Sequence, residues 1–518
     1  MWCGARSMAL ARSRARWRRR AEPMAAAAIH ECDVLIAGGG PTRVTLALLL
    51  ARQGVSVIVA EKEAEVYPLP RAAHLDHEII RVFQEVGAAE AIVRSSRQSS
   101  RYDFLNAAGD ILLRFTGSDR IGPGGWPAAN MIHQPSVERV LRDRLADYPA
   151  ARLETRWDVL SFAEDADGVI AQIDTPDGQQ EVRARYLVGA DGARSPMRKA
   201  AGIGFEDLGF EEPWLVVDTI VQDFSRLPPV NLQICDPERP TTCVLMGEGR
   251  HRWEFMIRPG ETPEEISADA TIARLMAPWK VDGAVTLERK AVYTFRARIA
   301  EQWRKGRLLL AGDAAHQTPP FAGQGLCSGI RDAANLAWKL AAILRDGAPD
   351  SLLDSYQPER EPNLRATIGM AIMMGRTVCI TDPAAAAERD RQMLAARAAG
   401  QSPDGAPAYP PLDTGVVLAG SAGAGSYFPQ ATADGARLDD ALGAGAWLLA
   451  RGTAAGEEGI RSAGLDDPAL APFRQALETW LDAHDAPAVL VRPDRYVFGT
   501  GDAAVLAQAW RNAVSAGG

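Results

Sequence analysis

Residues 32–62 read CDVLIAGGGPTRVTLALLLARQGVSVIVAEK, and this stretch decides the fold. An apolar run at 33–37 leads into three glycines, and residues 42–52 carry apolar side chains at helical spacing before Gly54. A second apolar run follows at 55–60. The order of strand, tight glycine turn, helix and strand predicts a complete βαβ unit of the kind that binds a dinucleotide.

Three positions in this unit have a direct physical role. Gly38 and Gly40 lack a Cβ, so amide groups at the start of the helix can approach a pyrophosphate closely. Glu61 ends the second strand about 20 residues after the glycines, where a carboxylate accepts hydrogen bonds from a ribose. The alternative for this segment is an ordinary βαβ crossover without a ligand.

One position departs from the pattern. The third glycine of the G-x-G-x-x-G pattern is replaced by Arg43, where glycine normally lets the helix pack tightly on the sheet. We expect the large side chain either to turn outward or to push the helix away, and to weaken ligand binding.

Composition excludes several classes of protein. A chain of 518 residues with 47% hydrophobic residues predicts two to four domains with large cores. A net charge of -9 argues against nucleic acid or an anionic membrane as the main partner, and no apolar run is long enough to span a bilayer. The six cysteines contain no CxxC pair, which favours a reducing cytoplasm without a disulfide framework, zinc site or other metal centre.

Residues 1–29 form an Arg/Ala-rich extension with seven arginines and one acidic residue, Glu22. This composition resembles an organelle transit peptide. Because Met24 directly precedes four alanines and the first strand, we interpret the extension instead as an upstream start or a disordered tail.

Two later stretches repeat the pattern of a strand that ends in glycine and aspartate. Residues 186–192 end in Asp191-Gly192, which places Asp191 at the carboxyl edge of a sheet, unless it belongs to a simple turn. Residues 306–313 end in Gly312-Asp313, and a glycine-rich loop follows before a helix at 330–344. Such a loop lets backbone approach a flat or charged ligand.

The three stretches 38–42, 189–192 and 312–316 resemble, in this order, the fingerprints of single-component FAD-dependent aromatic hydroxylases of the p-hydroxybenzoate hydroxylase fold. The resemblance covers roughly residues 32–375. Within that family the chain is most similar to the 3-(3-hydroxyphenyl)propionate hydroxylases, through short matches at residues 70–72, 125–127, 134–135, 214–218, 255–256, 259–262 and 356–360.

The resemblance implies FAD as cofactor, NADH or NADPH as co-substrate, and O2. Lys62 stands where the family usually has arginine, and Cys327 replaces a common asparagine, which a backbone contact tolerates. The positions that the resemblance assigns to FAD are Gly38, Gly40, Pro41, Thr42, Glu61, Lys62, Arg71, Gln134, Asp191, Gly312, Asp313, Gly325, Leu326 and Cys327.

The resemblance also implies hydroxylation of a phenol such as 3-(3-hydroxyphenyl)propionate or 3-hydroxycinnamate through a flavin C4a-hydroperoxide. Because a free phenol titrates near 10, some group must lower that pKa or take the proton. We expect His74 or Asp76 to do so, and Arg252, Trp253 and Pro320 to contact the substrate. Packing, helix capping or surface exposure is the alternative for the first four.

Two other functions stay open. A related flavoenzyme could act on a polyketide or another aromatic compound, since fold and cofactor do not fix the substrate. Alternatively, Arg43 has abolished FAD binding and left a non-catalytic protein.

The domain organisation follows from the alternation of patterns. We predict an α/β FAD-binding domain over 30–400, with an inserted substrate-binding sheet at about 100–130 and 206–292. A linker at 401–411 precedes a domain at 412–518 that resembles the thioredoxin-like domain of phenol hydroxylase relatives. Since no cysteine follows Cys379, disulfide chemistry is excluded there, and packing or homodimerisation is its expected role.

Overall fold

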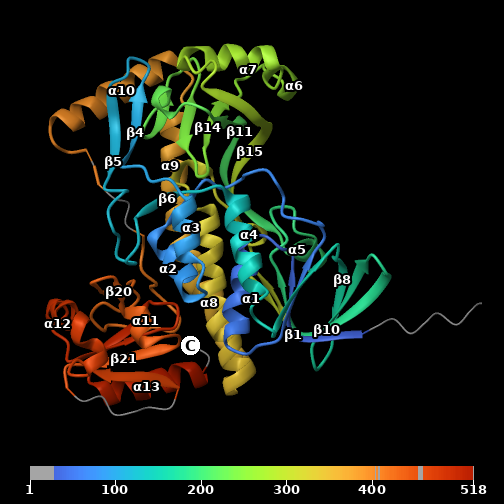
Figure 1. Ribbon diagram of the computed structural model, residues 1–518, viewed down its shortest axis with the longest axis vertical. Coiled ribbons are helices and arrows are strands. Elements are labelled where there is room, and N and C mark those ends of the chain that lie inside the picture. Colours follow the sequence, from blue (N-terminus) through green and yellow to red (C-terminus); the bar gives the residue numbers. More distant parts are fainter. Residues whose placement is uncertain (1–28, 403, 406–408, 453–458, 517–518) are drawn as a thin grey trace, which may run out of the picture.

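The computed structural model describes residues 29–402, 404–405, 409–452 and 459–516. Nearly all of the predicted N-terminal extension, residues 1–28, lies outside these ranges. Figure 1 shows three regions: a central α/β domain, a sheet above it capped by helices, and a C-terminal domain below. Among the described residues, no helix combines the length and apolar character needed to cross a membrane.

The central domain is built on the predicted βαβ unit. Strand β1 (Ile29–Ala37) pairs in parallel with β2 (Val57–Glu61), and helix α1 (Pro41–Arg52) connects them. Gly38 has a φ of +99°, which a side chain would strain, and Pro41 occupies the first turn of α1. The strand, turn, helix and strand predicted from the sequence are confirmed.

The main sheet collects the three fingerprint stretches at one edge. Its strand order is β16 (Arg304–Lys305), β17 (Leu308–Leu310), β10 (Gly178–Gly189), β1, β2 and β7 (Ala151–Thr155), while β9 (Val169–Thr175) and β8 (Asp158–Glu164) extend it antiparallel from β10. Since β1, β10 and β17 run parallel, Gly38, Asp191 and Gly312 lie at the same carboxyl edge. Helices α1 and α8 (Gly325–Asp346) pack against each other beside this sheet.

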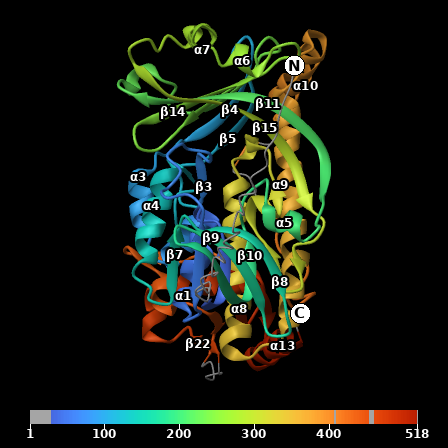
Figure 2. The same cartoon turned by 90° about the vertical axis from the view of Figure 1, so that its right-hand side faces the viewer.

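A second sheet is inserted between these strands. Its order is β18 (His316–Gln317), β15 (Val285–Ala300), β11 (Phe205–Val221), β14 (Arg250–Met256), β13 (Thr241–Leu245), β12 (Asn231–Cys235), β4 (Arg101–Asn106) and β5 (Ile111–Thr116). Figure 2 shows β11 and β15 curving from this sheet along the side of the molecule toward the central domain. Strand β3 (His74–Asp76) pairs with β6 (Ala129–Met131) between the two sheets.

Helices cover and connect the sheets. Helices α6 (Pro263–Ile266) and α7 (Asp269–Met276) lie above the outer face of the second sheet (Figure 1). Helices α9 (Tyr356–Val378) and α10 (Pro383–Ala398) rise beside it. Four further helices of this part of the chain are α2 (His77–Glu85), α3 (Ala89–Ser95), α4 (Gln134–Leu145) and α5 (Pro196–Ala200).

The C-terminal domain has a four-stranded sheet. Its strand order is β22 (Ile460–Gly464), β21 (Ala446–Ala450), β23 (Ala488–Val491) and β24 (Val497–Gly501), with β21 and β22 parallel and the other pairs antiparallel. Helices α12 (Arg474–Ala483) and α13 (Ala503–Ala516) complete it. Between β23 and β24 the chain turns at Pro493 and at Arg495, which has a φ of +68°.

Buried ion pairs join the C-terminal domain to the rest. Arg492 and Lys339 both bind the Glu359 carboxylate, at 2.7 and 2.8 Å, and all three side chains are fully buried. Arg81 of α2 pairs with Asp439 at 2.7 Å. The domain is therefore fastened to α2, α8 and α9 rather than tethered by its linker alone.

Candidate active site

A cavity of about 340 Å³ opens at the carboxyl edge of the main sheet. The predicted site residues that line it are Gly38, Gly40, Pro41, Glu61, Lys62, Arg71, Gln134 and Asp191. One oxygen of Asp191 accepts a hydrogen bond from the Met197 amide at 3.0 Å, while the other is buried without a hydrogen-bond partner in the described part of the chain. An orphaned carboxylate oxygen at such an edge indicates a ligand with hydrogen-bond donors.

The carboxylate of Glu61 is held in place by backbone amides. It accepts hydrogen bonds from Gly39 and, at 2.8 Å, from Glu63. Lys62 is exposed and lies 3.9 Å from the Glu63 carboxylate. Gln134 accepts a hydrogen bond from the Ala72 amide at 2.8 Å, which fastens the loop that carries Arg71 to the start of α4.

Arg43 turns out of the helix–sheet interface and folds back across the glycine turn. Its Nε donates to the Ala190 carbonyl, and a Cβ placed on Gly38 would lie 2.8 Å from that nitrogen. Burial lowers the pKa of Arg43, while the carboxylates of Glu61, Asp313 and others favour its charged form. The guanidinium therefore lies over Gly38 and Gly40 of the turn.

Helix α1 is not displaced by this substitution. Thr42 packs where α1 meets α8, and a Cβ placed on Gly329 would lie 2.7 Å from the Thr42 hydroxyl. Of the two outcomes expected for Arg43, the structure shows the outward turn.

The loop after β17 is held from below by Asp332, which the sequence analysis did not identify. Its carboxylate binds His316 at 2.7 Å, Arg360 at 3.1 Å and the Gly312 amide at 3.1 Å, and it is fully buried. Although burial opposes ionisation, these groups hold the pKa of Asp332 below its usual range. Asp313 itself is exposed and makes no hydrogen bond within the described residues, so its oxygens are available to a ligand.

The start of α8 presents free amides. Gly325, Leu326 and Cys327 form its first turn, where amide groups have no partner within the helix. The Cys327 thiol points inward, 3.8 Å from the carbonyl oxygens of His74 and Gly323, and burial raises its pKa well above the ordinary value. Because the thiol points inward, the groups that this turn offers to a ligand are backbone amides.

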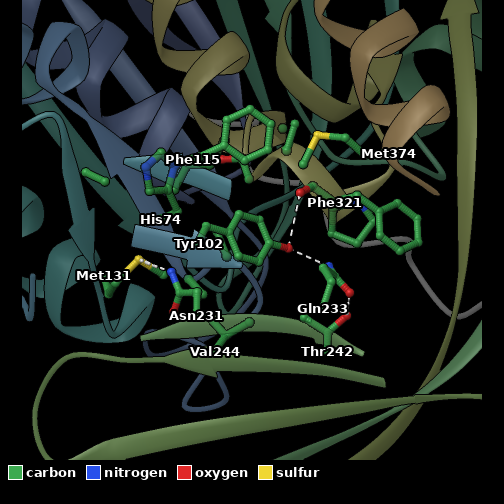
Figure 3. Close-up of a pocket in the computed structure, with 18 of the residues that line it drawn as sticks. His74, Tyr102, Phe115, Met131, Asn231, Gln233, Thr242, Val244, Phe321 and Met374 are labelled. Atoms are coloured by element: carbon green, nitrogen blue, oxygen red, sulfur yellow. Dashed lines mark hydrogen bonds between the residues drawn. The ribbon is translucent and has the colours of Figure 1, made fainter. Parts of the chain in front are cut away.

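A second cavity of about 250 Å³ lies between the α8 loop and the inserted sheet (Figure 3). Aromatic and apolar side chains form its upper walls, and polar side chains from the strands form its floor, as Figure 3 shows. Pro320, Gly325 and Leu326 also line it. Arg71 lines both cavities, so the two adjoin.

Of the two candidate catalytic residues, His74 lines the second cavity and Asp76 does not. The Nδ1 atom of His74 lies 3.2 Å from the Gly323 carbonyl oxygen. Burial lowers the pKa of His74, so the ring is neutral near pH 7. Since a carbonyl only accepts, Nδ1 carries the proton and Nε2 is left as an acceptor.

Asp76 lies outside the cavity, which corrects our expectation for it. Its carboxylate caps α2 through the amides of Glu78 and Ile79 and binds Arg331 at 2.7 Å. Burial favours the neutral acid, but Arg331 and the neighbouring histidines outweigh it and hold the pKa of Asp76 well below its usual range. The charged Asp76 carboxylate therefore serves to cap α2 and to bind Arg331.

Neighbouring residues on β14 face opposite sides. Arg252 lines the cavity, binds Asp218 at 2.6 Å, and donates to the carbonyls of Arg71 at 2.7 Å and Pro70 at 2.9 Å. Trp253 is fully buried on the other face, where its ring lies 5.9 Å from that of Trp279. The expected substrate contact by Trp253 does not fit this geometry.

The polar floor was missed by the sequence analysis. The Tyr102 hydroxyl accepts a hydrogen bond from Gln233, and Gln233 accepts one from Thr242 at 2.7 Å. Glu254 also lines the cavity, and burial raises its pKa to about 7 although Arg252 opposes the shift. A signal for this floor was present in the sequence, because several strands of the inserted sheet each carry a polar residue on the face that is turned toward the cavity.

Comparison with known proteins identifies the family. The family described as FAD binding domain matches residues 31–371, and the HcaD C-terminal domain family matches residues 465–516. The chain belongs to the FAD-dependent aromatic hydroxylases. This hydroxylase is 39% identical to the probable NADH-specific resorcinol 4-hydroxylase of Rhodococcus jostii, over 93% of this chain and 95% of the relative.

Two further similarities agree with this assignment. The hydroxylase is 35% identical to a 3-(3-hydroxyphenyl)propionate/3-hydroxycinnamic acid hydroxylase of Burkholderia cenocepacia, over 92% of this chain and 95% of the relative. It also resembles the crystal structure of aklavinone-11 hydroxylase with FAD and aklavinone, with a TM-score of 0.75, 25% identity, and coverage of 94% of this chain and 99% of that one.

The residues of the two cavities fit FAD. The glycine turn, the orphaned oxygen of Asp191 and the free carboxylate of Asp313 lie along one continuous edge of the main sheet. Arg43 lies across the glycine turn, and what crosses it is the end of a flexible side chain rather than backbone. Bound FAD supplies electron transfer from the nicotinamide nucleotide and activation of O2.

Proposed function

We propose that this hydroxylase adds a hydroxyl group to a small phenol, ortho to the existing hydroxyl. A phenol, NAD(P)H, a proton and O2 give the phenol with one additional ring hydroxyl, NAD(P)⁺ and water. Support comes from the relatives, whose names state resorcinol or 3-(3-hydroxyphenyl)propionate and 3-hydroxycinnamic acid as substrates.

The observation that carries this proposal is the second cavity. Its volume of about 250 Å³ lies below the ~300–1,000 Å³ of sites for drug-sized ligands, which favours a single ring over a polycyclic polyketide. Phe115, Phe321 and Met374 supply apolar walls, and Pro320 adjoins the α8 loop. A phenol fits this combination of apolar walls and polar floor.

We propose that His74 accepts the proton of the phenolic hydroxyl. Its Nε2 is an acceptor beside the cavity, and the Gly323 carbonyl fixes the ring through Nδ1. An acceptor next to the phenolic hydroxyl raises the electron density of the ring, which favours attack by an electrophilic oxygen.

We assign the cofactor contacts in two groups. Around the adenosine and pyrophosphate half we place Gly38, Gly40, Pro41, Thr42, Glu61, Lys62, Arg71, Gln134 and Asp191. Around the ribityl chain and the ring we place Gly312, Asp313, Gly325, Leu326 and Cys327. Cavity lining, free hydrogen-bonding groups and position at the sheet edge support these assignments.

The test is a panel of phenols with the purified flavoprotein. We expect slow NAD(P)H oxidation alone and faster oxidation with resorcinol or 3-(3-hydroxyphenyl)propionate, with an equal amount of hydroxylated product. Equal oxidation rates with and without every phenol, and peroxide as the sole product, would overturn the proposal.

Arg43 favours one competing function, a protein that binds no FAD. Its guanidinium lies over Gly38 and Gly40 of the glycine turn. Colour decides between the two: we expect a yellow protein with bound flavin, whereas a colourless protein that takes up no added FAD is the non-catalytic alternative.

We further propose a cytoplasmic, homodimeric enzyme. Five described cysteines are free, which suits a reducing compartment that supplies NAD(P)H. The C-terminal domain provides the surface for the dimer, and the mass in solution from light scattering tests that proposal.

A further inference from the structure

The floor of the substrate cavity ends in a carboxylate that the proposed reaction has not used. Tyr102, Gln233 and Thr242 are linked by hydrogen bonds on β4, β12 and β13. Thr242 lies directly opposite Glu254 of β14 in the sheet register. Strand β4 and the consecutive strands β12, β13 and β14 thus place Glu254 at the end of a polar row that faces the cavity.

The other polar groups of this row are satisfied by one another. Gln233 is fully buried, with its amide nitrogen bonded to Tyr102 and its oxygen to Thr242. Glu254 has no hydrogen bond among the described residues, and the Arg252 guanidinium is 3.6 Å from it, beyond hydrogen-bond distance. Its carboxylate is therefore the free acceptor on the sheet side of the cavity.

Two cations near Glu254, Arg252 and Arg289, are already bound by protein groups. Arg252 is bound by Asp218 and by two loop carbonyls, and Arg289 binds Asp218 at 3.2 Å and the Pro70 carbonyl. Arg71 lies at the junction of the two cavities, with its guanidinium 4.7 Å from the centre of the Tyr67 ring. A ligand carboxylate on the sheet side would meet Glu254 and the already bound Arg252, whereas Arg71, which has no ion pair among the described residues, lies at the junction of the two cavities.

We propose that Glu254 binds a substrate hydroxyl and makes the enzyme select an uncharged benzenediol over a phenol that carries a carboxylate side chain. This inference rests on the proposed phenol hydroxylation and names its substrate class. One hydroxyl lies toward His74 on the α8 side, and a second hydroxyl donates to Glu254 on the sheet side.

Ionisation of Glu254 gives this selection a pH dependence. Burial raises the pKa of Glu254 to about 7, so the carboxylate is mostly neutral at pH 6 and charged at pH 8. Burial lowers the pKa of His74, which favours its neutral form, and raises the pKa values of Tyr102 and Tyr409, which favours their neutral forms. The remaining charged neighbours are Arg71, Asp218, Arg252 and Arg289.

The test measures ligand binding to the holoenzyme without NAD(P)H, by the change in flavin absorbance. The ligands are resorcinol and 3-(3-hydroxyphenyl)propionate at pH 6 and pH 8, and the variant is Glu254→Gln. Glu288→Gln on β15 is the matched control, because that carboxylate binds Arg250 at 2.8 Å outside the cavity. Flavin content and thermal unfolding show that each variant is folded.

At pH 8 we expect Glu254→Gln to weaken resorcinol binding about tenfold and to tighten binding of the acid about tenfold. At pH 6 both changes should shrink to less than about threefold, and Glu288→Gln should match the parent throughout. Binding of both ligands by Glu254→Gln as in the parent at pH 8 would overturn the inference.

The outcome is separable from that of the proposed function. Loss of selection by Glu254→Gln, in an enzyme that hydroxylates neither phenol, would contradict the proposed reaction alone. Hydroxylation with unchanged selection would contradict the role of Glu254 alone.

Discussion

The two glycine-rich loops that we propose to face FAD are built differently. The loop after β17 rests on the buried carboxylate of Asp332, which fixes His316 and the Gly312 amide. The turn after β1 instead has the Arg43 guanidinium folded across it. One half of the site is thus set before the cofactor arrives, whereas the other half must first release a side chain. We infer that FAD affinity is limited at the pyrophosphate turn.

Removing Asp332 should have the largest effect. Asp332→Ala leaves Arg360 and His316 buried without their anion, so we expect a loss of about 3–5 kcal/mol in the free energy of unfolding and loss of flavin. Thermal and denaturant unfolding measure it. Asp354→Ala, at an exposed carboxylate that pairs with Arg304, should change stability by less than about 0.5 kcal/mol. Equal stability of the two variants would contradict the claim that Asp332 holds the loop after β17 in place.

Substitution of His74, which lies beside the loop after β17, should affect catalysis without affecting cofactor binding. His74→Ala should slow formation of hydroxylated product about a hundredfold, since it removes the proposed proton acceptor. FAD affinity should change less than about twofold, because His74 lies in the substrate cavity. His484→Ala in the C-terminal domain is the control. A variant that loses flavin and activity in parallel would mean that His74 only shapes the loop.

Asp313 should show the contribution of one exposed acceptor to cofactor affinity. Asp313→Ala should weaken FAD binding about tenfold or more by removing a charged hydrogen-bond acceptor, with little change in apoprotein stability. Fluorescence titration of apoprotein with FAD measures the dissociation constant. Asp346→Ala, exposed at the far end of α8, should bind FAD as the parent does. Full affinity in Asp313→Ala would remove this residue from the site.

The local parts of the fold could be predicted from the sequence. The β1–α1–β2 unit combines apolar periodicity, a glycine turn and Pro41 at the helix start, which are signals within one short segment. The same holds for the strands that end at Asp191 and Asp313. Placement of all three at one edge follows from the rule that ligands collect at the carboxyl ends of parallel strands.

The substrate cavity could not be predicted in the same way. Alternation along β14 shows that Arg252 and Trp253 face opposite sides, but it does not tell which side is the cavity. Tyr102 and Glu254 come from strands that pair only through β12 and β13, so their proximity depends on sheet order. The sequence shows an aspartate at position 76, but it does not show whether the side chain enters the site or caps a helix. That depends on Arg331, which is distant in the sequence and binds the Asp76 carboxylate.

The direct test of the limiting turn is FAD titration of apoprotein from the parent, Arg43→Gly and Arg43→Ala. The guanidinium must give up its contacts with Ala190 and the nearby carboxylates before a pyrophosphate reaches the amides. We predict about tenfold tighter binding in both variants, and unchanged binding in Arg52→Ala at the other end of α1. Affinity equal to the parent's, or weaker, would contradict the account, and weaker binding would make Arg43 a pyrophosphate ligand.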